Sequence, residues 1–308
     1  MQESRLHEHV YRHNAALPAR VTIPPGDDLA GLTFGDASVL VGVDQLVAGV
    51  HYDPARTDPA AAGRKAVNRN LSDVAAMAAY PLATLAAVAL PPGTPDREAE
   101  ALLAGLREAA ADGGAPVVGG DIAALPAAGP LVVSVTVLAE PAGIAPITRR
   151  GAQTGDDLWV SGSLGHSFVS GHHLTFNPRV RLARILAADP AIRPRAMMDL
   201  SDGLARDLPR LTPHAEIDAD RLPIRAAGVA TAALTRPAWE AAVDDGEDYE
   251  LLMVYPPDRR PPPKVDGVSL TRIGRVTAAG GVRLGDAAGR WHGLAGRGWD
   301  HDAGGSAS

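Results

Sequence analysis

The stretch Asn70-Leu71-Ser72-Asp73 runs directly into the alanine-rich segment Val74-Ala75-Ala76-Met77-Ala78-Ala79. Such a segment favours a helix, and the simplest local interpretation is that Ser72 or Asp73 caps its N-terminus. A similar arrangement recurs at Asp199-Leu200-Ser201-Asp202-Gly203-Leu204, again after an apolar stretch and before a helix-like segment. The recurrence favours a functional role for these carboxylates over capping alone.

Further aspartates fall at expected strand ends or in turns. They are Asp27 and Asp28 after Pro24-Pro25-Gly26, Asp44 after the apolar run Val39–Val43, which predicts a buried strand, and Asp121 after Gly119-Gly120. Hard divalent cations take oxygen ligands and are held through carboxylates together with substrate phosphates. We therefore interpret Asp73 as the centre of a metal–phosphate site.

Composition restricts the class of function. The chain has 308 residues, which suits two medium-sized domains, and 36 acidic against 29 basic residues give a net charge of −7. The acidic balance, without a long basic run, argues against a nucleic-acid surface, which needs clustered Lys and Arg. The absence of cysteine excludes disulfides, thiolate chemistry and cysteine-ligated zinc, and it fits a cytoplasmic protein.

One apolar segment could be mistaken for a membrane-spanning helix. Val74 to Pro92 contains no charged residue and is about long enough to span a bilayer. However, Pro81, Pro91 and Pro92 interrupt it, and alanine dominates over leucine, isoleucine and phenylalanine. We expect a buried helix followed by a buried strand, in a soluble protein without a membrane partner.

Periodicity and turn residues predict the other elements. Helices are expected over residues 97–112, 179–188 and 226–234, and strands over 116–118, 131–138, 158–160, 196–198, 251–255, 268–276 and 281–284. The loop Ser161-Gly162-Ser163-Leu164-Gly165 is a weak candidate for binding phosphate through backbone N–H groups at a helix start. The acidic stretch Asp244–Glu250 fits a solvated loop and a cation-binding loop about equally well.

Taken in chain order, these motifs resemble the thiamine-monophosphate kinases, within the superfamily of aminoimidazole-ribotide synthase-like enzymes. The resemblance covers about Gly26 to His301. It rests on Gly26-Asp27-Asp28; Asp44 with Leu46-Val47-Ala48-Gly49-Val50-His51; Asn70 to Met77; Gly119-Gly120-Asp121; Arg149 with Gly151-Ala152 and Gly155-Asp156; Asp199 to Leu204; Gly246 to Leu251; and Gly298-Trp299-Asp300-His301.

The resemblance implies an α/β fold with two domains, residues 1–140 and 141–308. It also implies a homodimer, in which the N-terminal sheet pairs with that of a second subunit, and ATP- and Mg²⁺-dependent phosphorylation of thiamine monophosphate to the diphosphate. Carried over by position, magnesium would be held by Asp28, Asp44, Asp73, Asp121, Asp199 and Asp202. ATP would be contacted by Gly120, Asp121, Arg149 and Ser201, and the thiamine phosphate by His51, Glu247 and Trp299. No general base is implied.

The chain departs from the family pattern at several positions. Gly42 and Val43 stand where hydroxyl residues usually precede the aspartate, Ile122 and Ala123 stand where threonine is common, Ala78 and Asp245 replace glycines, and His166 replaces an aspartate. Two alternatives therefore stay open. One is a divergent member that phosphorylates or ATP-activates another small substrate, and the other is a non-catalytic binder of nucleotide or thiamine phosphate.

Overall fold

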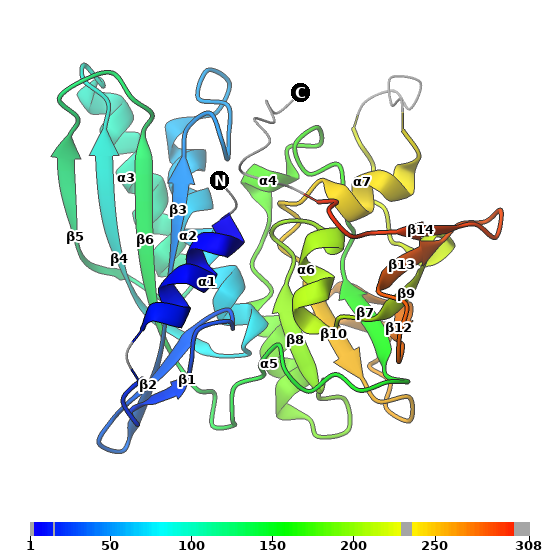
Figure 1. The fold of residues 1–308 in the computed structure, drawn as a ribbon. Helices are drawn as coiled ribbons and strands as arrows, with labels where there is room; N and C mark the ends of the chain where they lie inside the picture. Colours follow the sequence, from blue (N-terminus) through cyan, green and yellow to red (C-terminus); the bar gives the residue numbers. More distant parts are fainter. Residues whose placement is uncertain (1–2, 15, 229–235, 299–308) are drawn as a thin grey trace. The chain divides into compact units, whose positions relative to one another are not determined.

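The computed structural model describes residues 3–14, 16–228 and 236–298. These residues form two compact units. Unit 1 contains the described residues up to Val74 together with Ala79–Pro141, and unit 2 contains Ala75–Ala78 together with the described residues from Ala142 onward. Each unit is built on its own sheet (Figure 1), so the expected α/β class is confirmed.

Unit 1 has a six-stranded sheet in the order β1-β2-β3-β6-β4-β5. Its elements are α1 (Glu3–His13), β1 (Val21–Ile23), β2 (Ala30–Phe34), β3 (Ala37–Val47), α2 (Pro59–Ala76), β4 (Tyr80–Leu90), α3 (Asp96–Asp112), β5 (Val117–Ala124) and β6 (Val132–Glu140). Neighbouring strands are antiparallel except β4 and β5, which are parallel. Helices α2 and α3 lie against one face of the sheet (Figure 1).

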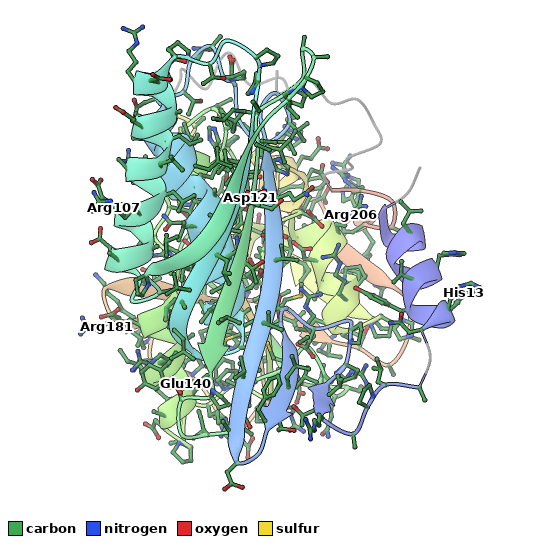
Figure 2. The ribbon with its side chains drawn as sticks, turned by 90° about the vertical axis from the view of Figure 1, so that its left-hand side faces the viewer. His13, Arg107, Asp121, Glu140, Arg181 and Arg206 are labelled. Atoms are coloured by element: carbon green, nitrogen blue, oxygen red, sulfur yellow. The ribbon has the colours of Figure 1, made fainter. Side chains whose placement is uncertain are left out.

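The apolar periodicity of the sequence accounts for this packing. In β6, Val133, Val135 and Val137 are fully buried while the residues between them are half-buried, which is the alternation of a strand with one covered face. In α3, Leu102 and Leu106 are buried, and Arg107 points away from the sheet (Figure 2). The predicted strand over 131–138 and helix over 97–112 are both confirmed.

Glycines bring α2 and α3 unusually close together. A Cβ on Gly63 of α2 would lie 2.1 Å from the carbonyl oxygen of Leu102, and a Cβ on Gly105 of α3 would lie 2.0 Å from that of Ala60. No side chain larger than hydrogen fits at either point. The pair of glycines therefore fixes the position of α2, which carries Lys65, Arg69, Asn70 and Asp73.

Three local interpretations were wrong. Helix α2 begins at Pro59, a residue preorganised for a first helical turn, so Asp73 lies near its C-terminal end and is not an N-cap. Strand β3 continues to Val47, so Asp44 lies within the strand. Strand β5 passes through Gly119-Gly120-Asp121 without a turn, and Gly120 instead lets the backbone approach β4, where a Cβ would lie 1.9 Å from the Ala86 carbonyl oxygen.

Unit 2 has an eight-stranded sheet in the order β14-β13-β9-β12-β7-β10-β8, with β11 paired to β12. Its elements are β7 (Asp157–Ser161), α4 (His172–Thr175), α5 (Val180–Ala188), β8 (Ala196–Asp199), α6 (Leu204–Leu211), β9 (Ala215–Asp218), the 3₁₀ turn η1 (Ala219–Arg221), α7 (Ala238–Asp244), β10 (Leu251–Tyr255), β11 (Lys264–Val265), β12 (Val268–Val276), β13 (Val282–Gly285) and β14 (Trp291–Gly293).

The central strands of unit 2 agree with the sequence predictions. Strand β10 is buried at every position, as its continuous apolar run indicates, and it pairs antiparallel with β7 and β8. Residues 226–228 are not helical, and the rest of the helix predicted over 226–234 lies outside the described residues. Across the part of the chain that the structure describes, no helix is both long and apolar enough to cross a membrane.

Candidate metal and phosphate site

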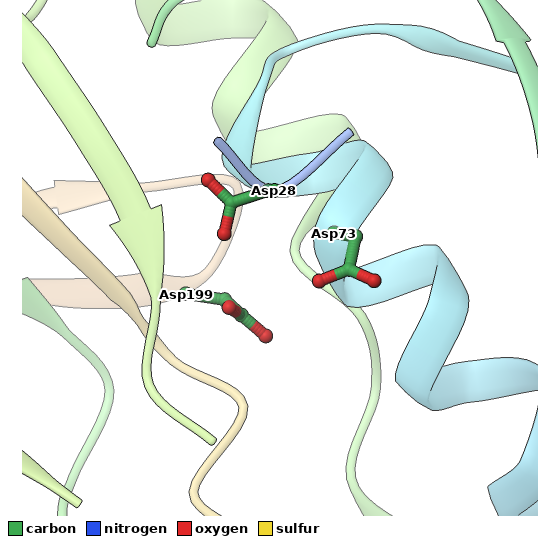
Figure 3. A group of neighbouring side chains, drawn as sticks. All are labelled: Asp28, Asp73 and Asp199. Atoms are coloured by element: carbon green, nitrogen blue, oxygen red, sulfur yellow. The ribbon is translucent and has the colours of Figure 1, made fainter. Parts of the chain in front are cut away.

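The aspartates Asp28 and Asp73 come together in unit 1. Each offers a carboxylate oxygen within 4.8 Å of the other, and both residues are half-buried. Figure 3 shows which element carries each acidic residue: the turn before β2 for Asp28, α2 for Asp73, and the end of β8 in unit 2 for Asp199. The turn and the helix, which are 45 residues apart in sequence, therefore deliver two carboxylates to one place.

This arrangement is electrostatically unfavourable without a cation. Like charges at this distance repel each other, and a carboxylate near the C-terminal end of a helix meets the negative end of the helix dipole. A bound cation would offset both effects. An all-oxygen donor set fits a hard divalent ion such as Mg²⁺.

The polar face of α2 joins it to β3. Arg69 donates from Nη1 to the carbonyl oxygen of Gln45 at 2.9 Å, and its Nε lies 3.6 Å from the Asp44 carboxylate. The side-chain oxygen of Asn70 accepts a hydrogen bond from the Asp44 backbone N–H at 3.2 Å. One turn further along the same helix face stands Asp73, so the contacts with β3 set the position from which Asp73 projects.

The side chains of Asp44 and Asp121 point to opposite faces of the sheet. Asp44 is in register with the buried Val135, on the helix-covered face. Asp121 is in register with the exposed Ala87, and successive residues of a strand alternate between faces. Among the described residues neither belongs to the group around Asp28 and Asp73, so their roles as metal ligands stay predictions.

His51 is held in a defined hydrogen-bonding state. Its Nδ1 lies 2.9 Å from the backbone N–H of Val47, which can only donate. Nδ1 must therefore accept, and the neutral ring carries its proton on Nε2. The fully buried Lys65 of α2 donates from Nζ to the His51 carbonyl oxygen at 2.5 Å. The loop thus presents His51 as an Nε2–H donor, which suits an anionic partner.

In unit 2, a buried carboxylate organises the second acidic motif. Asp207 of α6 accepts backbone hydrogen bonds from Ser201 and Asp202 at 3.0 and 2.9 Å. Burial, followed by the negative charge of Asp202, raises the pKa of Asp207 well above its ordinary value. Arg210 pairs with Asp202 at 2.8 Å and with Asp207 at 3.3 Å. The Asp207 carboxylate therefore fixes the backbone of Ser201 and Asp202.

Arg149 lies near this motif. Burial lowers the pKa of Arg210, but the carboxylates Asp207 and Asp202 outweigh this effect and raise it, with the positive charge of Arg149 opposing the rise. Asp202 is already paired with Arg210, and Arg206 also lies 3.9 Å from its carboxylate. A metal ion at Asp202 would therefore have to compete with two guanidinium groups.

The candidate phosphate loop Ser161–Gly165 has a different role. No helix begins directly after it, and its groups bind carboxylates of the protein. The Gly165 N–H donates to both oxygens of Asp248 at 2.9 and 3.1 Å, and Ser161 Oγ donates to Glu250 at 2.5 Å. The phosphate-binding interpretation was wrong, because this loop and the acidic stretch are partners.

The other predicted residues are placed as follows. Glu247 is buried, with a backbone φ of +57°, and Gly120 lies in the edge strand β5. Trp299 lies outside the described residues. Sequence reasoning missed Asp207 and the structural role of Lys65, which as a cation beside the acidic motif could equally have met an anionic substrate group. The signals available were a lysine on the otherwise apolar face of α2 and an acidic residue in the first turn of α6.

Two of the residues that depart from the family pattern, His166 and Asp245, contact each other. The Asp245 carboxylate accepts a hydrogen bond from the His166 N–H at 2.7 Å. His166 has a φ of +57°, a conformation in which Asp, Asn and His are enriched. These replacements therefore have a structural explanation within unit 2.

Gly42 and Val43 can be tested by substitution. A Cβ on Gly42 would lie 2.4 Å from Cδ2 of the buried Leu29, so Gly42→Ser should displace Leu29 next to Asp28 and destabilise the protein by about 1–3 kcal/mol. Val43 is 63% exposed, so Val43→Thr should change stability by less than about 0.5 kcal/mol. Urea unfolding of both variants measures this difference, and equal stabilities would contradict the packing described here.

Asp73→Asn tests the carboxylate pair. Without metal, the variant should be more stable than the wild type by about 0.5–1 kcal/mol, because it relieves repulsion from Asp28 and from the helix dipole. Mg²⁺ should raise the melting temperature of the wild type and leave that of the variant unchanged. Asp112→Asn, at the end of α3, is the matched control and should keep the response to Mg²⁺. An equal response of Asp73→Asn and wild type would contradict a metal site here.

Comparison with known proteins identifies the family. Residues 26–140 match the family model "AIR synthase related protein, N-terminal domain". The thiamine-monophosphate kinase of Halobacterium salinarum is 38% identical over 291 residues, covering 87% of this chain and 94% of that protein. The enzyme of the same name from Mycobacterium tuberculosis (strain H37Rv) is 35% identical over 260 residues, covering 77% of this chain and 76% of that protein.

Solved structures agree with these relatives. A structure described as "AaThiL complexed with AMPPCP and TMP" superposes with a TM-score of 0.81 at 26% identity, covering 97% of both chains. Thiamine-monophosphate kinase from Stenotrophomonas maltophilia K279a gives a TM-score of 0.69 at 30% identity, covering 90% of this chain and 94% of that one. The chain therefore belongs to the thiamine-monophosphate kinase family.

Proposed function

We propose that this protein uses ATP and Mg²⁺ to phosphorylate thiamine monophosphate to thiamine diphosphate. The observation that carries the proposal is the Asp28–Asp73 carboxylate pair, found in a chain whose relatives are named for this reaction. A structural neighbour at 26% identity is described as complexed with AMPPCP and TMP. Substrate and cofactor are thus inferred from the family and supported by the local chemistry.

The chemistry suits the residues available. The acceptor is already a phosphate oxygen, so direct in-line transfer needs no general base. The main obstacle is repulsion between the acceptor phosphate and the triphosphate, which bound magnesium offsets while aligning the reacting atoms. The protein's part is to hold oxygen ligands rigidly. Asp73, on a helix fixed by Gly63 and Gly105, meets this requirement.

We assign the remaining roles by their positions in the family motifs. Magnesium ligands come from Asp28, Asp44, Asp73, Asp121, Asp199 and Asp202. Contacts to ATP come from Gly120, Asp121, Arg149 and Ser201, and contacts to the thiamine phosphate come from His51, Glu247 and Trp299. The Nε2–H donor of His51 supports its assignment, because a phosphate oxygen accepts such a bond.

We further propose that two copies associate through unit 1 as a homodimer. The support is an exposed apolar surface on the sheet face opposite the helices, where Val43 and Leu85, both in register with Thr136, are 63% and 38% exposed. All eight residues of the edge strand β5 are exposed as well. An uncovered apolar surface ending in an unpaired edge strand favours association with another sheet. A cytoplasmic location stays a prediction.

The reaction is tested by incubating the protein with ATP, Mg²⁺ and thiamine monophosphate and separating the products by chromatography. Thiamine diphosphate and ADP should form in equal amounts. Formation should stop in excess chelator and resume when Mg²⁺ is restored. Thiamine monophosphate binding without turnover would indicate a binder, and turnover only with other small phosphates or carboxylates would indicate a divergent member.

The dimer is tested by light scattering after size exclusion. The wild type should have twice the chain mass. Leu85→Glu places a charge on the exposed sheet surface and should give the monomer mass, while Val169→Glu, at an exposed apolar residue of unit 2, should remain dimeric. A monomeric wild type would overturn the proposal.

A further inference from the structure

The segment Gly246–Glu250, here called the strap, has an unusual backbone. Gly246, Glu247 and Tyr249 all have positive φ, at +66°, +57° and +50°. Glycine tolerates this region, but non-glycine residues adopt it at an energetic cost and only where the surrounding structure imposes it. Two such residues within three positions indicate that other contacts hold the strap in place.

The strap pairs with the second acidic motif. The Glu247 N–H donates to the Ser201 carbonyl oxygen at 2.7 Å, and the Tyr249 N–H donates to that of Leu200 at 2.8 Å. The Leu200 N–H donates in return to the Glu250 carbonyl oxygen at 2.9 Å. These bonds extend the β8–β10 ladder beyond Asp199. Any shift of the strap therefore moves the backbone of Leu200 and Ser201 with it.

The first anchor of the strap is Glu250. Its carboxylate is almost fully buried and receives two hydrogen bonds from Arg179, from Nε at 2.8 Å and from Nη2 at 2.6 Å. Ser161 Oγ donates to the same carboxylate and accepts from the Leu251 N–H at 2.8 Å. A bidentate guanidinium fixes direction as well as distance.

The second anchor is Asp248, also almost fully buried. It pairs with Arg225 at 2.6 Å and accepts from Ser167 Oγ at 2.7 Å and from the Gly165 N–H. Burial raises the pKa of Asp248 to about 6, with Arg225 acting in the opposite direction. His172 donates from Nε2 to the Asp248 carbonyl oxygen at 3.0 Å.

The anchors and the strained residues alternate along the strap. Asp248 and Glu250 each pair with an arginine. Glu247 precedes Asp248, and Tyr249 lies between the two anchors with its ring stacked on that of Phe176 at a centroid distance of 4.0 Å. Buried ion pairs contribute little net stability compared with apolar residues of the same volume, and their best-supported use is to specify one arrangement. The arrangement specified here is the orientation of Glu247 and of the Leu200–Ser201 backbone.

We infer that Arg179 is a positioning residue, which acts through Glu250, beside the second anchor formed by Arg225 and Asp248, to hold Glu247 and the Ser201–Asp202 segment in the geometry that meets the acceptor phosphate and the metal. This inference rests on the proposed function for the roles of Glu247 and Ser201. Arg179 touches no substrate in this account. Its effect should therefore appear in acceptor binding rather than in stability alone.

Three variants separate positioning from stability. Arg179→Met combined with Glu250→Gln removes the pair without leaving an unpaired buried charge. Arg179→Lys keeps the charge but loses the bidentate geometry. Arg181→Met is the matched control, since Arg181 lies on α5 just beyond Arg179, but its side chain is 80% exposed and pairs with Asp266 rather than with a residue of the strap.

The Arg179→Met/Glu250→Gln double variant should raise the KM for thiamine monophosphate about tenfold while kcat changes less than about threefold, and Arg179→Lys should fall between it and the wild type. Arg181→Met should match the wild type. In hydrogen exchange, the backbone amides of Leu200, Glu247 and Tyr249 should exchange about tenfold faster in the double variant than in the wild type and the control. A KM and exchange rates equal to those of the wild type, with only a lower melting temperature, would overturn the inference.

The two readouts distinguish failure of the inference from failure of the proposed function. If the wild type does not phosphorylate thiamine monophosphate, the proposed function fails, while the amide exchange still reports whether Arg179 holds the strap. If the wild type turns over and the double variant keeps both its KM and its exchange rates, the positioning role fails and the function stands. Should the double variant fail to fold, Arg179→Lys supplies the same two measurements.

Discussion

Repulsion between negative charges is the constraint on which the structure of this protein depends. Unit 1 holds the carboxylates of Asp28 and Asp73 within 4.8 Å of each other, and in the proposed reaction two phosphate groups must meet. Burial and a helix C-terminus increase the repulsion. Such a site requires a backbone that is fixed by other contacts, and a bound cation would offset the repulsion.

The surrounding residues supply that rigidity. The glycine contacts between α2 and α3 fix the helix that carries Asp73, and Arg69 and Asn70 join it to β3. In unit 2, Asp207 holds the Ser201–Asp202 backbone, and buried arginine–carboxylate pairs hold the strap. Charged residues in both units thus serve mainly to fix the backbone. Phosphoryl transfer requires ligands that are positioned with this precision.

The sequence predicted what depends on pattern and failed where tertiary contacts decide. The alternation of 131–138 and the periodicity of 97–112 identified β6 and α3, and the order of the acidic motifs identified the family. The simplest local interpretation of Asp73, an N-cap, failed because nothing local shows that α2 starts at Pro59, whereas its interpretation as a metal ligand came from the recurrence of the acidic motif. The glycine loop was mistaken for a phosphate loop because its partners, Asp248 and Glu250, lie more than 80 residues away.

The most direct test of the central claim is metal binding itself. Mn²⁺ can be titrated into the protein and followed by electron paramagnetic resonance, with Mg²⁺ as competitor. The account predicts that the wild type binds Mn²⁺, that Mg²⁺ displaces it, and that Asp28→Asn combined with Asp73→Asn removes this binding while the fold is kept. Mn²⁺ binding of the same strength and stoichiometry in the double variant would contradict the claim that these two carboxylates form the metal site.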